Sequence, residues 1–92
     1  MAKVIVTLKI MPEDPDVNLD EVKQKAEEVI KSFEGMMNRT EIEPVGFGLN
    51  AVILVFAVDE KKGSPDPIAE AITQKVPGVR SAEVTMVSRA LG

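Results

Sequence analysis

The 92-residue sequence contains no histidine, cysteine, tryptophan or tyrosine. The chain therefore lacks a Ser-His or Cys-His nucleophile, an imidazole or thiolate metal ligand, and a disulfide framework. Its three aromatic residues are Phe33, Phe47 and Phe56. An RNA-binding sheet of this size carries two or three aromatics on its central strands, so that class is disfavoured. The composition leaves few groups for catalysis, and we expect neither a bound metal nor a cofactor.

Positive charge and long hydrophobic runs are also scarce. The formal net charge is −4, which argues against a chain that binds nucleic acid directly through its phosphates. No apolar run approaches the roughly 20 residues that a membrane span needs, and the first residues lack the apolar core of a signal peptide. With 45% hydrophobic residues, the chain can form one core. We expect a single cytoplasmic domain over residues 1–92 with no membrane contact.

The first part of the chain predicts a strand followed by a helix. Apolar and polar residues alternate from Lys3 to Ile10, which indicates a strand with one buried face. Asn18 is a suitable N-cap for the helix, and Glu21 three residues later completes a capping-box pattern. Gly35 is placed to end this helix.

Two strands joined by a tight bend are expected next. Thr40–Val45 predicts the first strand, and Pro44 places it at a sheet edge or next to a bulge. Gly46-Phe47-Gly48 supplies the bend, and Leu49–Val58 predicts the second strand. Residues 51–58 are apolar at every position, which favours a central strand that is covered on at least one face.

The last part predicts a second helix and a fourth strand. Asp66 is expected to cap the helix and Pro77-Gly78 to stop it, before an alternating strand over Ser81–Arg89. With right-handed crossovers, this order predicts an α+β, ferredoxin-like split βαβ sandwich (βαββαβ). It has a four-stranded antiparallel sheet with both helices on one face, and the first and third strands lie at its centre.

The loop after the first strand resembles a calcium loop only in part. Four polar residues fall at the odd positions of that pattern: Asp14, Asp16, Asn18 and Asp20. Leu19 stands where the pattern requires glycine, and Lys25 stands where it requires a bidentate glutamate. An ordinary solvated loop is therefore favoured, with incidental calcium binding at Asp14 and Asp16 as the alternative.

Two further positions allow a structural and a functional interpretation. Gly46-Phe47-Gly48 precedes a strand, whereas phosphate-binding glycine loops open a helix. Its glycines can simply permit a bulge while Phe47 fills the core, or the bend can present an aromatic anchor to a partner. Arg89 is either a solubilising strand end or a cation that reaches a partner's phosphate or metal site. Lys61 and Lys62 can likewise solvate a turn or contact a partner.

Several segments together resemble one family. They are Pro44–Leu49 (Pro-Val-Gly-Phe-Gly-Leu), the apolar strand after it, the acidic turn Val58–Lys61, and Val79–Val84 near the C-terminus. Together with the opening strand and its Pro-Glu-Asp loop, these segments resemble translation elongation factor 1-beta over essentially the whole chain. The length is similar to that of the compact archaeal form, which consists only of the guanine-nucleotide exchange domain.

This resemblance implies a guanine-nucleotide exchange factor that promotes GDP release and GTP loading on elongation factor 1-alpha during protein synthesis. No bond is made or broken by such a factor. The resemblance implies that Phe47, between Gly46 and Gly48, docks on the GTPase. Arg89 falls where eukaryotic members have a lysine that enters the magnesium site, where a cation competes with the metal. The alternative is a non-enzymatic ferredoxin-like regulatory or oligomerisation module, which would bind a small molecule or pair two sheets through the outer side of the third strand.

Overall fold

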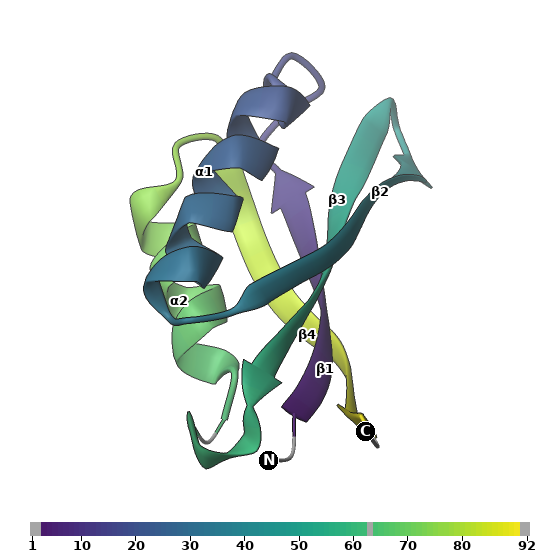
Figure 1. The fold of residues 1–92 in the computed structure, drawn as a ribbon. Coiled ribbons are helices and arrows are strands. Elements are labelled where there is room, and N and C mark those ends of the chain that lie inside the picture. Colours follow the sequence, from purple (N-terminus) through teal and green to yellow (C-terminus); the bar gives the residue numbers. More distant parts are fainter. Residues whose placement is uncertain (1–2, 63, 91–92) are drawn as a thin grey trace.

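The computed structural model describes residues 3–62 and 64–90. Its elements are β1 (Lys3–Pro12), α1 (Leu19–Ser32), β2 (Met36–Gly46), β3 (Leu49–Asp59), the 3-10 helix η1 (Glu60–Lys62), α2 (Asp66–Lys75) and β4 (Val79–Ala90). The four strands form an antiparallel sheet in the order β2-β3-β1-β4, and both helices cover one face of it (Figure 1). The predicted split βαβ sandwich is confirmed, with the first and third strands at its centre.

The core lies between the helices and the two central strands. Phe56 on β3 is its largest fully buried side chain, and it shares the helix-covered face with Val52, Leu54 and Val58. The remaining apolar residues of β3 point to the opposite face, which no helix covers (Figure 1). Ala51 and Val55 on that face are buried as well, which accounts for the unbroken apolar run over residues 51–58.

Helix α1 ends at Ser32, just before Gly35 as the sequence predicted. Glu34 has φ +63°, and its N–H donates to the Lys31 carbonyl at 2.9 Å. The Gly35 N–H donates to the Ile30 carbonyl at 2.9 Å, so the two bonds form a Schellman motif. Gly35 itself is needed for space, because a Cβ there would lie 2.5 Å from Ile30 Cγ2.

Replacing Gly35 with alanine is therefore expected to destabilise the fold by about 1–3 kcal/mol, because the added methyl group overpacks a helix end that is already in contact. Urea unfolding followed by circular dichroism measures this loss. Gln24→Ala on the exposed side of α1 is the matched control and should change stability by less than about 0.5 kcal/mol. Equal stability of Gly35→Ala and the control would contradict the packing argument.

Of the two predicted N-cap residues, one is confirmed and the other is wrong. Asn18 caps α1 as predicted, since its Oδ1 accepts a hydrogen bond from the Glu21 N–H at 3.2 Å. The predicted Asp66 cap is wrong: Pro65 is the N-cap of α2, and Asp66 is the first helical residue. The helix starts earlier because the Pro65 carbonyl already accepts from Ile68 at 3.0 Å, while the Asp66 N–H donates to the Ser64 hydroxyl at 3.2 Å.

Within the described ranges, no helix is both long enough and apolar enough to cross a membrane.

Candidate functional site

A two-residue turn joins β2 to β3. Gly46 pairs with Leu49, which leaves Phe47 and Gly48 as the central residues of the turn. Both have positive φ, +56° and +76°, as a type I′ hairpin turn requires. The register shifts between Pro44 and Gly46, so the predicted bulge lies directly before the turn.

Phe47 is the outermost side chain of this turn, with 100% of its surface exposed. The interpretation in which Phe47 fills the core is therefore wrong, and Phe56 occupies that place. A left-handed conformation costs a residue with a side chain about 1–2 kcal/mol, and Phe47 recovers none of this cost by burial. An aromatic that is both strained and solvated is typical of a position kept for contact with a partner.

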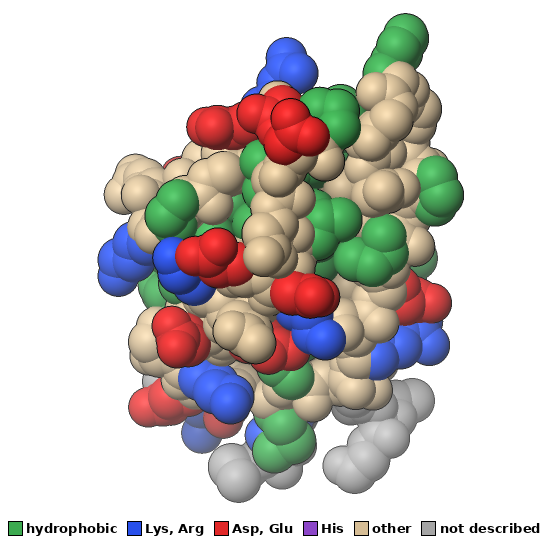
Figure 2. Space-filling model, turned by 90° about the horizontal axis from the view of Figure 1, so that it is seen from above, with side chains coloured by type: hydrophobic (Ala, Val, Ile, Leu, Met, Phe, Trp, Pro, Cys, Tyr) green, Lys and Arg blue, Asp and Glu red, His purple; other side chains and the backbone are tan. Residues whose placement is uncertain are grey.

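The loop between β1 and α1 lies beside this turn. A Cβ on Gly48 would stand 3.8 Å from Pro15 Cγ, so the hairpin and the loop are in near contact. Asp14 Oδ1 accepts the Asp16 N–H at 2.8 Å, which makes the loop an Asx turn. Seen from above, acidic, basic and hydrophobic side chains are interspersed over the molecule, and hydrophobic ones project at its rim (Figure 2).

Arg89 lies near the end of β4, opposite Val4 of β1, and Val4 in turn lies opposite Val58 of β3. Its Nη2 donates a hydrogen bond to Glu60 Oε1, and the two side chains form an ion pair. This hydrogen bond, and then the charge of the carboxylate, raise the pKa of the Arg89 guanidinium above its ordinary value. No sequence pattern predicted Glu60 as the partner of Arg89, because the two residues are 29 positions apart.

The structure does not bring Phe47 and Arg89 together. Phe47 precedes the first residue of β3, whereas Arg89 lies level with its last residues, at the other end of a molecule 41 Å long (Figure 1). A rise of roughly 3.3 Å per residue along β3 separates the two levels by about 30 Å. They would contact a partner at two separate places. Lys61 is exposed near Arg89, and the side chain of Lys62 lies outside the described residues.

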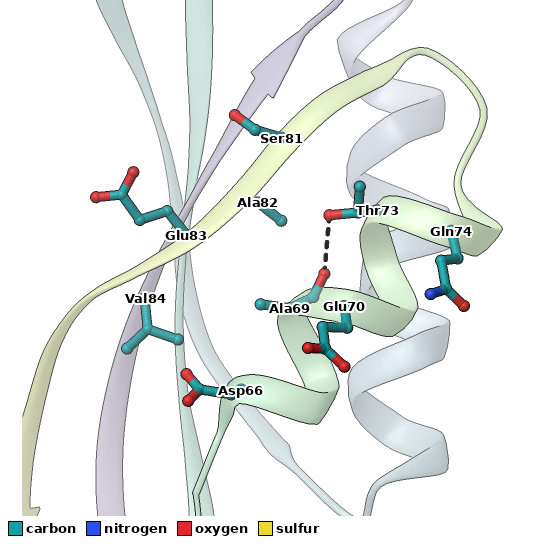
Figure 3. Close-up of a pocket in the computed structure, with 9 residues that line it drawn as sticks. All are labelled: Asp66, Ala69, Glu70, Thr73, Gln74, Ser81, Ala82, Glu83 and Val84. Atoms are coloured by element: carbon teal, nitrogen blue, oxygen red, sulfur yellow. Dashed lines mark hydrogen bonds between the residues drawn. The ribbon is translucent and has the colours of Figure 1, made fainter.

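A shallow groove lies between α2 and β4. Its lining includes the carboxylates of Asp66 and Glu70, so it would repel the phosphates of a nucleotide. The Glu83 side chain points away from the helix, and the Thr73 hydroxyl is bonded to the Ala69 carbonyl at 3.0 Å (Figure 3). In the described part of the chain, no group of three or more acidic residues is placed to hold a metal ion.

Comparisons with known proteins identify the family of the chain. Residues 5–90 match the family described as the EF-1 guanine nucleotide exchange domain. The protein named elongation factor 1-beta in Methanococcoides burtonii is 43% identical, over 97% of this chain and 98% of that protein. The protein of the same name in Thermococcus gammatolerans is 44% identical, over 94% of this chain and 93% of that protein. In Methanococcus aeolicus the identity is 39%, over 95% of this chain and the whole of the relative. The chain belongs to the EF-1 guanine nucleotide exchange domain family.

A solved structure supports the fold alone. The ACT domain from the GTP pyrophosphokinase of Chlorobium tepidum superposes with a TM-score of 0.59, covering 89% of this chain and 97% of the domain. Its sequence identity is 19%, so the likeness concerns the path of the chain and not its function.

Proposed function

We propose that this chain, acting as one exchange domain, promotes GDP release from elongation factor 1-alpha through two contacts, Phe47 and Arg89. Membership of the exchange-domain family supports the activity. One observation supports the docking site most strongly: Phe47 is wholly exposed and left-handed at the tip of a hairpin. That combination has a cost in the free chain, and contact with a partner accounts for it.

Phe47 serves docking in this proposal. A rigid aromatic side chain loses little conformational entropy when a pocket encloses it, and such residues supply much of the binding energy at protein interfaces. Gly46 and Gly48 allow the positive φ values around it, so the ring projects from a short turn with few rotatable bonds of its own. The two glycines thus present the anchor and need not contact the partner through side chains.

In this proposal, Arg89 promotes the release of GDP from the GTPase. A GTPase holds GDP through magnesium and the loop that cradles the phosphates, so a guanidinium brought to that place competes with the metal. No bond is made or broken by the exchange domain. The acceleration comes from a bias of the GTPase toward a conformation that holds the nucleotide weakly. Because about 30 Å separates the two residues, docking and release are distinct contacts on one partner.

The alternative is a module that pairs two sheets through the uncovered face of the sheet. The residues of β3 on the uncovered face are Ala51, Ile53, Val55 and Ala57. Of these, Ala51 is fully buried and Val55 is 7% exposed without any helix above them. The apolar area of β3 that a second sheet could still cover is correspondingly small. The exposed side chains of Met36 on β2 and Met86 on β4 lie on the same face, but the family of the chain favours exchange over sheet pairing.

The release of a fluorescent GDP from elongation factor 1-alpha of the same source tests the proposal. At fixed magnesium concentration, addition of the chain at micromolar concentration is expected to accelerate release many-fold over the spontaneous rate. Bovine serum albumin at equal concentration controls for nonspecific effects. No acceleration across a range of magnesium concentrations would refute exchange on this partner.

A further inference from the structure

The ion pair between Arg89 and Glu60 crosses the end of a strand. Glu60 follows β3, Arg89 belongs to β4, and β1 lies between these two strands. Two strand spacings of about 4.8 Å separate the backbones that carry the pair. The long Arg89 side chain therefore reaches across the end of the sheet to Glu60, although most of its surface stays exposed.

Glu60 is held in a defined place from which it can act on Arg89. It opens η1, and the turn before η1 is closed by the Lys61 N–H, which donates to Asp59 Oδ1 at 2.9 Å. The Glu60 side chain is 37% exposed, whereas that of Arg89 is 68% exposed. The carboxylate is thus the more enclosed partner, and the more exposed guanidinium is the one with room to move away.

A guanidinium that is paired with a carboxylate is a weaker competitor for a metal site. Its charge is offset by the neighbouring negative charge, and at least one of its donors is occupied. A carboxylate that stayed beside it would also repel the phosphates of a bound nucleotide. For Arg89 to act on a phosphate or magnesium site, it has to leave Glu60.

We propose that Glu60 is a positioning residue that restrains Arg89 in the free chain and releases it when the chain docks. This inference rests on the proposed role of Arg89 in nucleotide release. Glu60 does not contact the nucleotide in this scheme and acts only through Arg89. An exposed ion pair is weak, so the restraint tunes the rate without preventing exchange.

Glu60→Gln tests the restraint because it keeps the size of the side chain and removes its charge. We expect this variant to accelerate GDP release by about twofold to fivefold, the range that loss of an exposed ion pair allows. The magnesium concentration that halves the rate should rise by a similar factor. The matched control is Glu41→Gln, which removes the same charge from another exposed ion pair, with Arg39 at 3.7 Å. It should leave both quantities unchanged.

The same substitution in an Arg89→Gln chain separates the restraint from a general effect of charge. Without the guanidinium there is nothing to release, so Glu60→Gln should have no effect in that background. A slower or unchanged rate for Glu60→Gln alone would overturn the proposal. Equal acceleration in the Arg89→Gln background would overturn it as well.

A measurement on the free chain does not depend on exchange activity. In nitrogen-15 NMR spectra at low temperature, rotation about the Nε–Cζ bond of Arg89 should be slowed by the ion pair, so that its two Nη signals are resolved. Glu60→Gln should merge them and Glu41→Gln should not. Identical Arg89 signals in the wild type and Glu60→Gln would overturn the restraint. A wild-type chain that fails to accelerate GDP release but passes this test would refute only the proposed function.

Discussion

Replacing Phe47 with asparagine is expected to make the fold more stable and the exchange factor nearly inactive. Asparagine tolerates the left-handed conformation, and Asn-Gly is a preferred pair for a type I′ turn, so the free energy of unfolding should rise by about 1 kcal/mol. The same change removes the fully exposed ring. Loss of an anchor of this kind should reduce the rate of GDP release at low chain concentration by about 30-fold or more. Urea unfolding and stopped-flow release of fluorescent GDP measure the two effects.

Phe47→Trp is the matched control, because it keeps an aromatic ring in the same turn. Its exchange rate should stay within about threefold of the wild type if the ring is what the partner binds. Because the two expected effects of Phe47→Asn have opposite signs, unfolding of the variant cannot account for a loss of activity. Full exchange activity in Phe47→Asn would show that the hairpin tip has another use.

The architecture could be predicted from the sequence because its strongest patterns agree with one another. The alternation in β1, the capping signal at Asn18 and the wholly apolar run of β3 each define an element, and the chain order then leaves one common sandwich topology. Strand lengths were less predictable. β2 begins at Met36, before the expected Thr40, because hydrogen bonding to β3 extends an edge strand beyond its alternating part.

The sequence left the structure undecided or misleading where one local pattern is compatible with two conformations. Asp66 fits a capping pattern, but the carbonyl of Pro65 starts the helix earlier. The position of Gly35 at the end of α1 was predicted correctly, but the sequence pattern does not indicate that Glu34 takes the left-handed conformation and that Gly35 makes room for Ile30. For Phe47, spacing alone left core and partner contact open, and only the direction in which the turn projects its side chain separates them.

The candidate site residues could be identified one by one in the sequence, but their arrangement in space could not. Gly46-Phe47-Gly48 is a local pattern, and its turn conformation follows from its own residues. The Arg89–Glu60 pair depends on three strands lying in the order β3-β1-β4, which no local pattern encodes. The separation of the two candidate contacts likewise follows from the topology, because antiparallel strands carry Phe47 and Arg89 to opposite ends of the sheet.

Replacing Arg89 with alanine is expected to slow GDP release without weakening docking. At saturating chain, the release rate in the presence of magnesium should fall by about tenfold or more, the range for removal of a charged contact. The concentration of chain that gives half the maximal rate should change little, because Phe47 supplies the docking contact about 30 Å away. Arg89→Lys keeps a cation at the same place and should retain most of the rate.

Removal of magnesium tests directly whether Arg89 acts by competing with the metal. With excess chelator there is no metal for the guanidinium to compete with, so wild type and Arg89→Ala should release GDP at the same rate. Phe47→Asn should remain defective under the same conditions, since docking does not depend on the metal. If the defect of Arg89→Ala persists without magnesium, Arg89 acts on the phosphates or on the conformation of the GTPase and not through the metal. If both variants lose activity equally under all conditions, the two ends of the sheet do not have the separate roles that their distance implies.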